Sequence, residues 1–182
     1  MKYLALFLTL VLSTTVQAQT VTIAHGGTSA TTAAQARINL GLPSVLVQTT
    51  DDTTSSLTAH SSPLTFSAAK NSVYTFDVYG YFTSSSNAGI KAAVAVPSGA
   101  TLVATAIETG TTASDTHTEA FTASGTLGAA FTQGTSLNGV FHIHGVVTTA
   151  STANSVTLQF AKVTSGTATL KAGSYIKWTK VS

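Results

Sequence analysis

The segment VYTFDVYGYF, residues 73–82, shows the clearest structural pattern in this chain. Large apolar residues recur at every second position, and successive side chains of a β-strand point to opposite faces. The segment therefore predicts a strand that turns one face towards a hydrophobic core. The core face carries Tyr74, Phe76, Val78 and Phe82, with Gly80 among them. The opposite face carries Thr75, Asp77, Tyr79 and Tyr81.

Further short strands are predicted by the same alternation elsewhere. Ile90–Val96 is one, ended by Pro97 and Gly99, and Leu102–Ile107 is another. Three strands are predicted near the C-terminus from their inward-facing residues. These residues are Phe141, Ile143 and Val147, then Val156, Leu158 and Phe160, then Ile176 and Trp178. The segment Thr109–Gly139 is poor in large apolar residues, so we expect long loops there with one or two short strands.

The composition also favours β structure. The chain has 35 Thr and 21 Ser but only 14 charged residues, a balance that suits strands with hydroxyl-rich outer faces. It has no cysteine, so packing and subunit association must supply the stability that disulfides would otherwise add. The predicted fold is all-β: a jelly-roll-like antiparallel β-sandwich over residues 44–182, preceded by one short N-terminal helix.

That helix is predicted within His25–Pro43, where the apolar period becomes helical. Thr31 or Thr32 suits the N-cap. Gly41 suits the left-handed position after the helix, and Pro43 stops the helix from continuing. Residues on neighbouring helical faces are Ala33, Ala34, Arg37 and Ile38. About two turns of helix are unstable alone in water, so this segment must pack on the following domain or on copies of itself.

The sequence GGTSATTAAQARINLGL, residues 26–42, resembles a segment, GGT-GATTAA-AR-NLGL, that recurs in tail-fibre and other virion structural proteins of bacteriophages. It departs from that pattern at Ser29, Gln35 and Ile38. In such fibres the segment lies at a junction between the shaft and the head of a homotrimer, and the resemblance implies the same here. The residues that would mediate oligomerisation are Ala33, Ala34, Arg37, Ile38 and Leu40. The alternative is a generic Ala/Thr-rich linker helix.

Two later stretches resemble a globular domain found in many phage structural proteins. They are FTSSSNAGIKAAVAVPSGA, residues 82–100, and VTLQFAKVTSGTATLKAGSYIKW, residues 156–178. The resemblance extends over Val45–Val181. Its recurring features are framework residues rather than a catalytic signature, so it implies a virion module and names no ligand.

Residues 1–18 have the features of a signal peptide. Lys2 is followed by an apolar run that is too short to span a bilayer, and Val16 and Ala18 suit the positions before a cleavage site. We therefore expect export through the inner membrane, a mature chain that starts at Gln19, and an N-terminal arm with the junction helix over residues 19–43. The alternative is an uncleaved anchor or a buried N-terminal strand.

Few residues suggest chemistry. His142 and His144 would share one face of a strand, and in a homotrimer six imidazoles on the axis could bind a transition metal. The alternative is a solvent-facing pair, with Phe141 and Ile143 in the core. Two nitrogens from one chain make no metal site without symmetry, so no metal or other cofactor is predicted.

Other polar groups give no catalytic pattern. Asp51 and Asp52 are adjacent and read as a turn opening. Asp115, His117 and Glu119 would share one strand face, but a solvated loop is the simpler interpretation. No serine lies in a GxSxG context, and no phosphate-binding loop is present. We expect no enzymatic activity.

The formal charge of +2 leaves no basic patch for a phosphate backbone, so nucleic acid is not an expected partner.

The sequence favours a non-enzymatic virion structural protein, which is a spike, fibre head or capsid-decorating knob. Its expected partners are copies of itself, other virion proteins and a host-surface glycan or protein. The alternative is a secreted or cell-surface bacterial adhesin or carbohydrate-binding module that uses Tyr79 and Tyr81 as an aromatic platform. The third class of function that we consider is a hydrolase.

Overall fold

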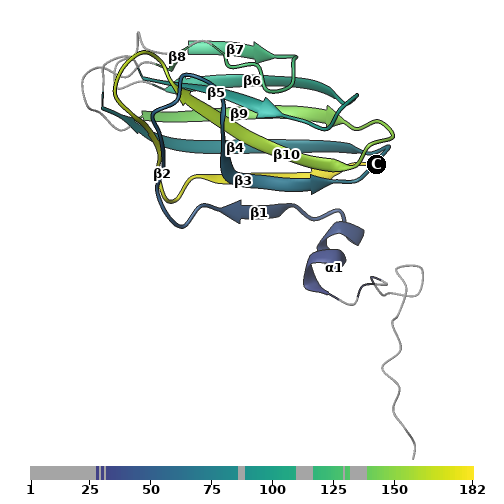
Figure 1. Cartoon of the computed structure of the whole chain (residues 1–182). Coiled ribbons are helices and arrows are strands. Elements are labelled where there is room, and N and C mark those ends of the chain that lie inside the picture. Colours follow the sequence, from purple (N-terminus) through teal and green to yellow (C-terminus); the bar gives the residue numbers. More distant parts are fainter. Residues whose placement is uncertain are drawn as a thin grey trace, which may run out of the picture.

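The computed structural model describes residues 28, 30, 32–85, 89–109, 117–128, 130–131 and 139–182 (Figure 1). This part of the chain forms one short helix and twelve strands. The helix is α1 (Ala33–Asn39). The strands are β1 (Ser44–Val47), β2 (Asp52–Thr54), β3 (His60–Ala68), β4 (Val73–Ser84), β5 (Ile90–Ala95), β6 (Thr101–Thr109), β7 (His117–Phe121), β8 (Ala130–Phe131), β9 (Gly139–Thr148), β10 (Asn154–Lys162), β11 (Ala168–Leu170) and β12 (Tyr175–Lys180).

These strands form two antiparallel sheets. The larger has eight strands in the order β1-β12-β4-β9-β6-β7, and β11 pairs with both β2 and β4. The smaller has four strands in the order β3-β10-β5-β8. The two sheets pack face to face as layers of a sandwich, as Figure 1 shows. The predicted all-β antiparallel sandwich with one short helix near its N-terminus is therefore confirmed.

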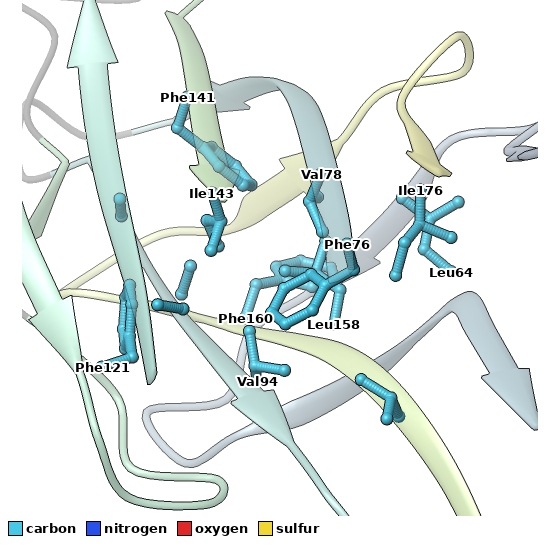
Figure 2. Packing of buried hydrophobic residues seen from close by; sticks show 14 of the residues in the cluster. Leu64, Phe76, Val78, Val94, Phe121, Phe141, Ile143, Leu158, Phe160 and Ile176 are labelled. Carbon is cyan, nitrogen blue, oxygen red and sulfur yellow. The ribbon is translucent and has the colours of Figure 1, made fainter. Parts of the chain in front are cut away.

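β4 is the central strand that its sequence predicts. Its core-facing residues Tyr74, Phe76, Val78 and Phe82 are buried, and the alternate residues face outwards. Gly80 is opposite Phe141 of β9, and a Cβ atom at position 80 would lie 2.1 Å from Cζ of that ring. Only glycine leaves room for this aromatic ring against the strand. Figure 2 shows Phe141 and Ile143 of β9 pointing into the same core as Phe76 and Val78.

The other predicted strands are present as well. Leu158 and Phe160 of β10 and Ile176 of β12 are fully buried, and Trp178 packs at the margin of the core. The described part of Thr109–Gly139 contains the two short strands β7 and β8, as expected. The strands that the sequence did not reveal are β1, β2, β3 and β11.

Helix α1 has the predicted ends. Thr32 is its N-cap, and the Thr32 hydroxyl accepts a hydrogen bond of 3.2 Å from the Gln35 N–H. Gly41 has a φ of 65°, and the Leu42 N–H donates to the Arg37 carbonyl at 2.8 Å, which is the Schellman arrangement. In Figure 1, α1 lies beyond β1, outside the two layers. No helix in the described residues is long and apolar enough to cross a membrane.

Candidate functional site

The outer face of the eight-stranded sheet carries a polar and aromatic cluster across three neighbouring strands. Asp77 and Tyr79 come from β4, His142 and His144 from β9, and Tyr175 from β12. The register explains the grouping: Asp77 pairs with His144, and Tyr79 pairs with both His142 and Tyr175. We call these five residues the Asp77 cluster. Phe141 and Ile143 lie in the core, so the predicted orientation of the two histidines is confirmed.

One carboxylate oxygen of Asp77 lies within hydrogen-bond distance of both His142 and His144. Asp77 Oδ1 lies 3.2 Å from His142 Nε2 and 2.7 Å from His144 Nδ1. A neutral imidazole donates from only one nitrogen, so these contacts select the Nε2–H form of His142 and the Nδ1–H form of His144. Partial burial raises the pKa of Asp77, but the hydrogen bonds from His144 and His142 outweigh it and hold that pKa below its ordinary value. Asp77 is therefore ionised at neutral pH.

The aromatic rings of the cluster stack on each other. Tyr79 lies between His142, with ring centroids 4.2 Å apart, and Tyr175, at 4.8 Å. Both faces of the Tyr79 ring are therefore covered by protein. Partial burial raises the pKa of Tyr175, with smaller contributions from Tyr79, Tyr81 and Asp77. Sugars bind to an open ring face, so the predicted platform is reduced to Tyr81, which is 41% exposed.

Hydrogen bonds and ring stacking join the side chains of the Asp77 cluster. Among the described residues, no group of three or more His, Cys, Asp or Glu side chains is placed to hold a metal ion. The sequence did not reveal that Asp77 joins His142 and His144, because Asp77 lies 65 residues before His142.

Asp51 and Asp52 have separate structural roles. Asp51 pairs with the Lys171 ammonium and accepts a 2.9 Å hydrogen bond from the Ala172 N–H, and these bonds lower the pKa of Asp51. Asp52 Oδ1 lies 2.9 Å from His60 Nε2, a contact that the sequence did not predict. The adjacent carboxylates therefore have different partners, and Asp52 begins strand β2 rather than a turn. Asp51 joins two loops that lie 120 residues apart in the chain, whereas Asp52 joins the consecutive strands β2 and β3.

Two of the predicted polar positions are not fully described. Asp115 lies outside the described residues, and so does the side chain of His117, whose backbone begins β7. Glu119 lies on strand β7, so at His117–Phe121 the structure has a strand where the sequence favoured a solvated loop. Residues 1–18, with the predicted signal peptide, also lie outside the described part of the chain.

The second surface of interest is formed by α1, β1 and the loop between them. It exposes six large apolar side chains within ten residues of chain: Ile38, Leu40, Leu42, Val45, Leu46 and Val47. β1 is an edge strand, since it pairs only with β12 in the described structure. We call this surface the N-terminal edge. Exposed apolar side chains beside an unpaired strand edge favour association with another chain.

Two grooves lie on the N-terminal edge, and Trp178 and Ser44 line both of them. The smaller, of about 40 Å³, is lined by Ile38, Leu42, Ser44, Ser67, Tyr74, Trp178 and Lys180. The larger, of about 400 Å³, is lined by Arg37, Ser44, Val45 and Trp178. Of the predicted oligomerisation residues, Arg37 and Ile38 therefore border grooves. Ala33 and Leu40 are exposed and line neither groove, and the side chain of Ala34 is outside the described part.

The sequence indicated the helix but not the groove. Trp178 belongs to β12 and Val45 to β1, two strands that pair although about 130 residues of chain separate them. The short apolar run at residues 45–47, with its two valines, is the feature of the sequence that could have indicated this groove.

Comparisons with known proteins give no relative for this chain: no protein-family model matches it, and neither a curated protein nor a solved structure does. Its function is therefore inferred from its own residues and surfaces.

Proposed function

We propose that this protein is a non-enzymatic structural protein of a bacteriophage virion, in the form of a spike, fibre head or capsid-decorating knob. The observation that carries the proposal is the N-terminal edge. It exposes a run of apolar side chains, and it coincides with the end of the 26–42 segment that resembles fibre junctions. A packed β-sandwich with an apolar edge next to a junction helix suits a module that is held on a larger assembly.

The proposed assembly is a homotrimer. Helix α1 has only seven residues, and isolated helices of that length are unstable in water. Copies of the chain would supply the missing burial, and the other proposed partners are further virion proteins and a host-surface glycan or protein. We place the protein at the virion surface, reached by export through the inner membrane.

Immunogold labelling of purified particles tests this function. Antibodies against the purified protein should place gold at the particle surface, and an unrelated periplasmic protein from the same cells serves as the control antigen. Particles that stay unlabelled, while the protein is found in the cell-free supernatant, would overturn the proposal.

The alternative function is a secreted or cell-surface adhesin or carbohydrate-binding module. The stacking of Tyr79 between His142 and Tyr175 counts against an open aromatic platform at that position. A measured sugar affinity that is lost in Tyr81→Ala, together with no association with particles, would favour this alternative.

A further inference from the structure

The Asp77 cluster brings three side chains that can ligate a metal to one point of a single chain. His142 and His144 lie two residues apart on β9, so both project from its outer face. Asp77, on the neighbouring strand β4, places Oδ1 3.2 Å from His142 Nε2 and 2.7 Å from His144 Nδ1. Ligand atoms at about 2.0–2.2 Å from one zinc ion lie about 3.0–3.4 Å from each other. The two oxygen–nitrogen distances are close to this spacing.

The two histidines differ in how firmly they are held. The His142 ring stacks on Tyr79, with ring centroids 4.2 Å apart, and the His142 side chain is 32% exposed. The His144 side chain is 63% exposed, so it can turn to meet an ion that arrives from solvent. A neutral imidazole can carry its proton on either nitrogen. Transfer of that proton to the other ring nitrogen frees His142 Nε2 and His144 Nδ1 to bind a metal.

We infer that Asp77, His142 and His144 of one chain bind a single divalent transition-metal ion that accepts imidazole and carboxylate ligands, such as zinc. Three protein ligands leave at least one coordination position for water. In the sequence, the two histidines alone are too few ligands unless three chains meet on an axis. The fold supplies the third ligand from β4 of the same chain. This inference is independent of the proposed virion function.

Binding of an ion requires a small rearrangement of Asp77. In the described structure the three side chains are not yet placed around an ion, because Asp77 Oδ1 itself occupies the point towards which both nitrogens are directed. Rotation of the partly exposed Asp77 side chain would open that point while keeping the carboxylate beside it. Lys177, the register partner of Asp77 on β12, is exposed and can extend its ammonium into solvent, away from the ion.

Isothermal titration calorimetry with zinc chloride tests the site on the full chain. Wild-type protein, first freed of metal with EDTA, should bind one zinc ion per chain. His144→Gln and Asp77→Asn should each weaken the affinity at least about tenfold. His60→Gln is the matched control, because His60 Nε2 lies 2.9 Å from Asp52 Oδ1 in a pair that has one histidine and one carboxylate. This control variant should bind zinc as the wild type does.

Nuclear magnetic resonance of the imidazole nitrogens identifies the ligand atoms directly. Addition of zinc to the wild type should change the signals of His142 Nε2 and His144 Nδ1 and leave those of His60 unchanged. This measurement uses no substitution, so it still applies if Asp77→Asn loses stability. Melting curves of the zinc-free variants show whether each variant is folded before its affinity is compared.

Three results would overturn the inference: no saturable zinc binding, equal affinity in the wild type and His144→Gln, or zinc-dependent signals that exclude His142 and His144. Binding of one ion per three chains that is lost on dilution to monomer would also overturn it, because the metal would then belong to a symmetric site on a three-fold axis. A protein that binds zinc in this way but labels no particle would keep the metal site and refute the virion function.

Discussion

At the scale of single residues, this protein depends on contacts whose two partners are far apart in the chain. Gly80 and Phe141 are one such pair, since the ring occupies the space where any larger residue would place its Cβ atom. Asp77 with His142 and His144 is another. The first pair belongs to the core and the second to the solvent side of the same two strands, β4 and β9.

Phe76 tests the core side of β4. Phe76 is 1% exposed, so Phe76→Ala should cost about 3–5 kcal/mol through lost burial and a residual cavity. Thr75→Ala, on the outer face of the same strand, should change stability by less than about 0.5 kcal/mol. Urea denaturation of both variants measures the difference. Equal losses would contradict the assigned register of the strand.

Asp77 tests the outer side of β4. The pKa of Asp77 is lower in the folded protein than in the unfolded chain, so the ionised carboxylate stabilises the fold. This stabilisation is fully present above the unfolded pKa of about 3.9 and is lost as the pH falls through the folded pKa. Asp77→Asn should therefore lower the melting temperature at pH 7 and have little effect near pH 2. After solvent screening we expect on the order of 1 kcal/mol, or about 2–4 °C.

Melting curves from pH 2 to 7 measure this dependence. Lys91→Gln is a useful comparison, because Lys91 lies on β5 in the other sheet and its loss should show no such acid dependence. A constant Asp77→Asn deficit across the whole range would contradict the role given to the carboxylate.

At the scale of elements, the strands and the helix are stabilised in different ways. β4 lies between two strands and buries one face completely, whereas β1 is an edge strand with most of its side chains exposed. β3, the edge of the smaller sheet, carries Pro63 at an exposed position, where a missing N–H is tolerated. β1 is short, which limits edge pairing, but it contains no proline and exposes Val45, Leu46 and Val47.

Thr32 tests whether α1 depends on its own cap. Thr32→Ala removes the acceptor for the Gln35 N–H and should cost the helix about 1 kcal/mol. Because α1 lies outside the two layers, we expect faster hydrogen exchange at the amides of α1 with an unchanged melting temperature. Thr32→Ser, which keeps the hydroxyl, should exchange as the wild type does. A large drop in melting temperature would show instead that α1 is part of the cooperative core.

At the scale of the whole molecule, association and export are the two properties to test. We expect light scattering of the wild type to give the mass of a trimer. Ile38→Asp should weaken it, because three like charges near one axis repel. Since Ile38 also lines its own groove, thermal unfolding of the monomer must be measured in parallel. A monomeric wild type, or an Ile38→Asp protein that stays fully trimeric, would refute the axial placement.

Export predicts a defined N-terminus. If residues 1–18 are a signal peptide, protein from its natural particle should begin at Gln19, and intact-mass analysis measures this directly. An Ala18→Lys variant should leave the precursor uncleaved, because a large charged side chain does not fit the site before the cut. Retention of Met1 in the natural protein would show that the segment has another role.

Local regularities in the sequence were enough to predict much of this fold. The period of two in residues 73–82 identified the core strand and its buried face. The cap and stop residues Thr32, Gly41 and Pro43 marked the ends of α1, because capping is a contact between near neighbours in the chain. The same patterns placed His142 and His144 on the outer face of β9.

Strand pairing is decided by tertiary structure, because backbone hydrogen bonds between strands carry no local signature in either partner. β1, β2 and β11 are only three or four residues long, too short for alternation to reveal, and they exist as strands through their neighbours. The same pairing brings Asp77 to the two histidines and Tyr175 to Tyr79. It also sets Trp178 beside Val45 and so forms the groove of the N-terminal edge. Sequence by itself thus determined the class of fold and the helix ends, whereas contacts between distant segments determined both candidate surfaces.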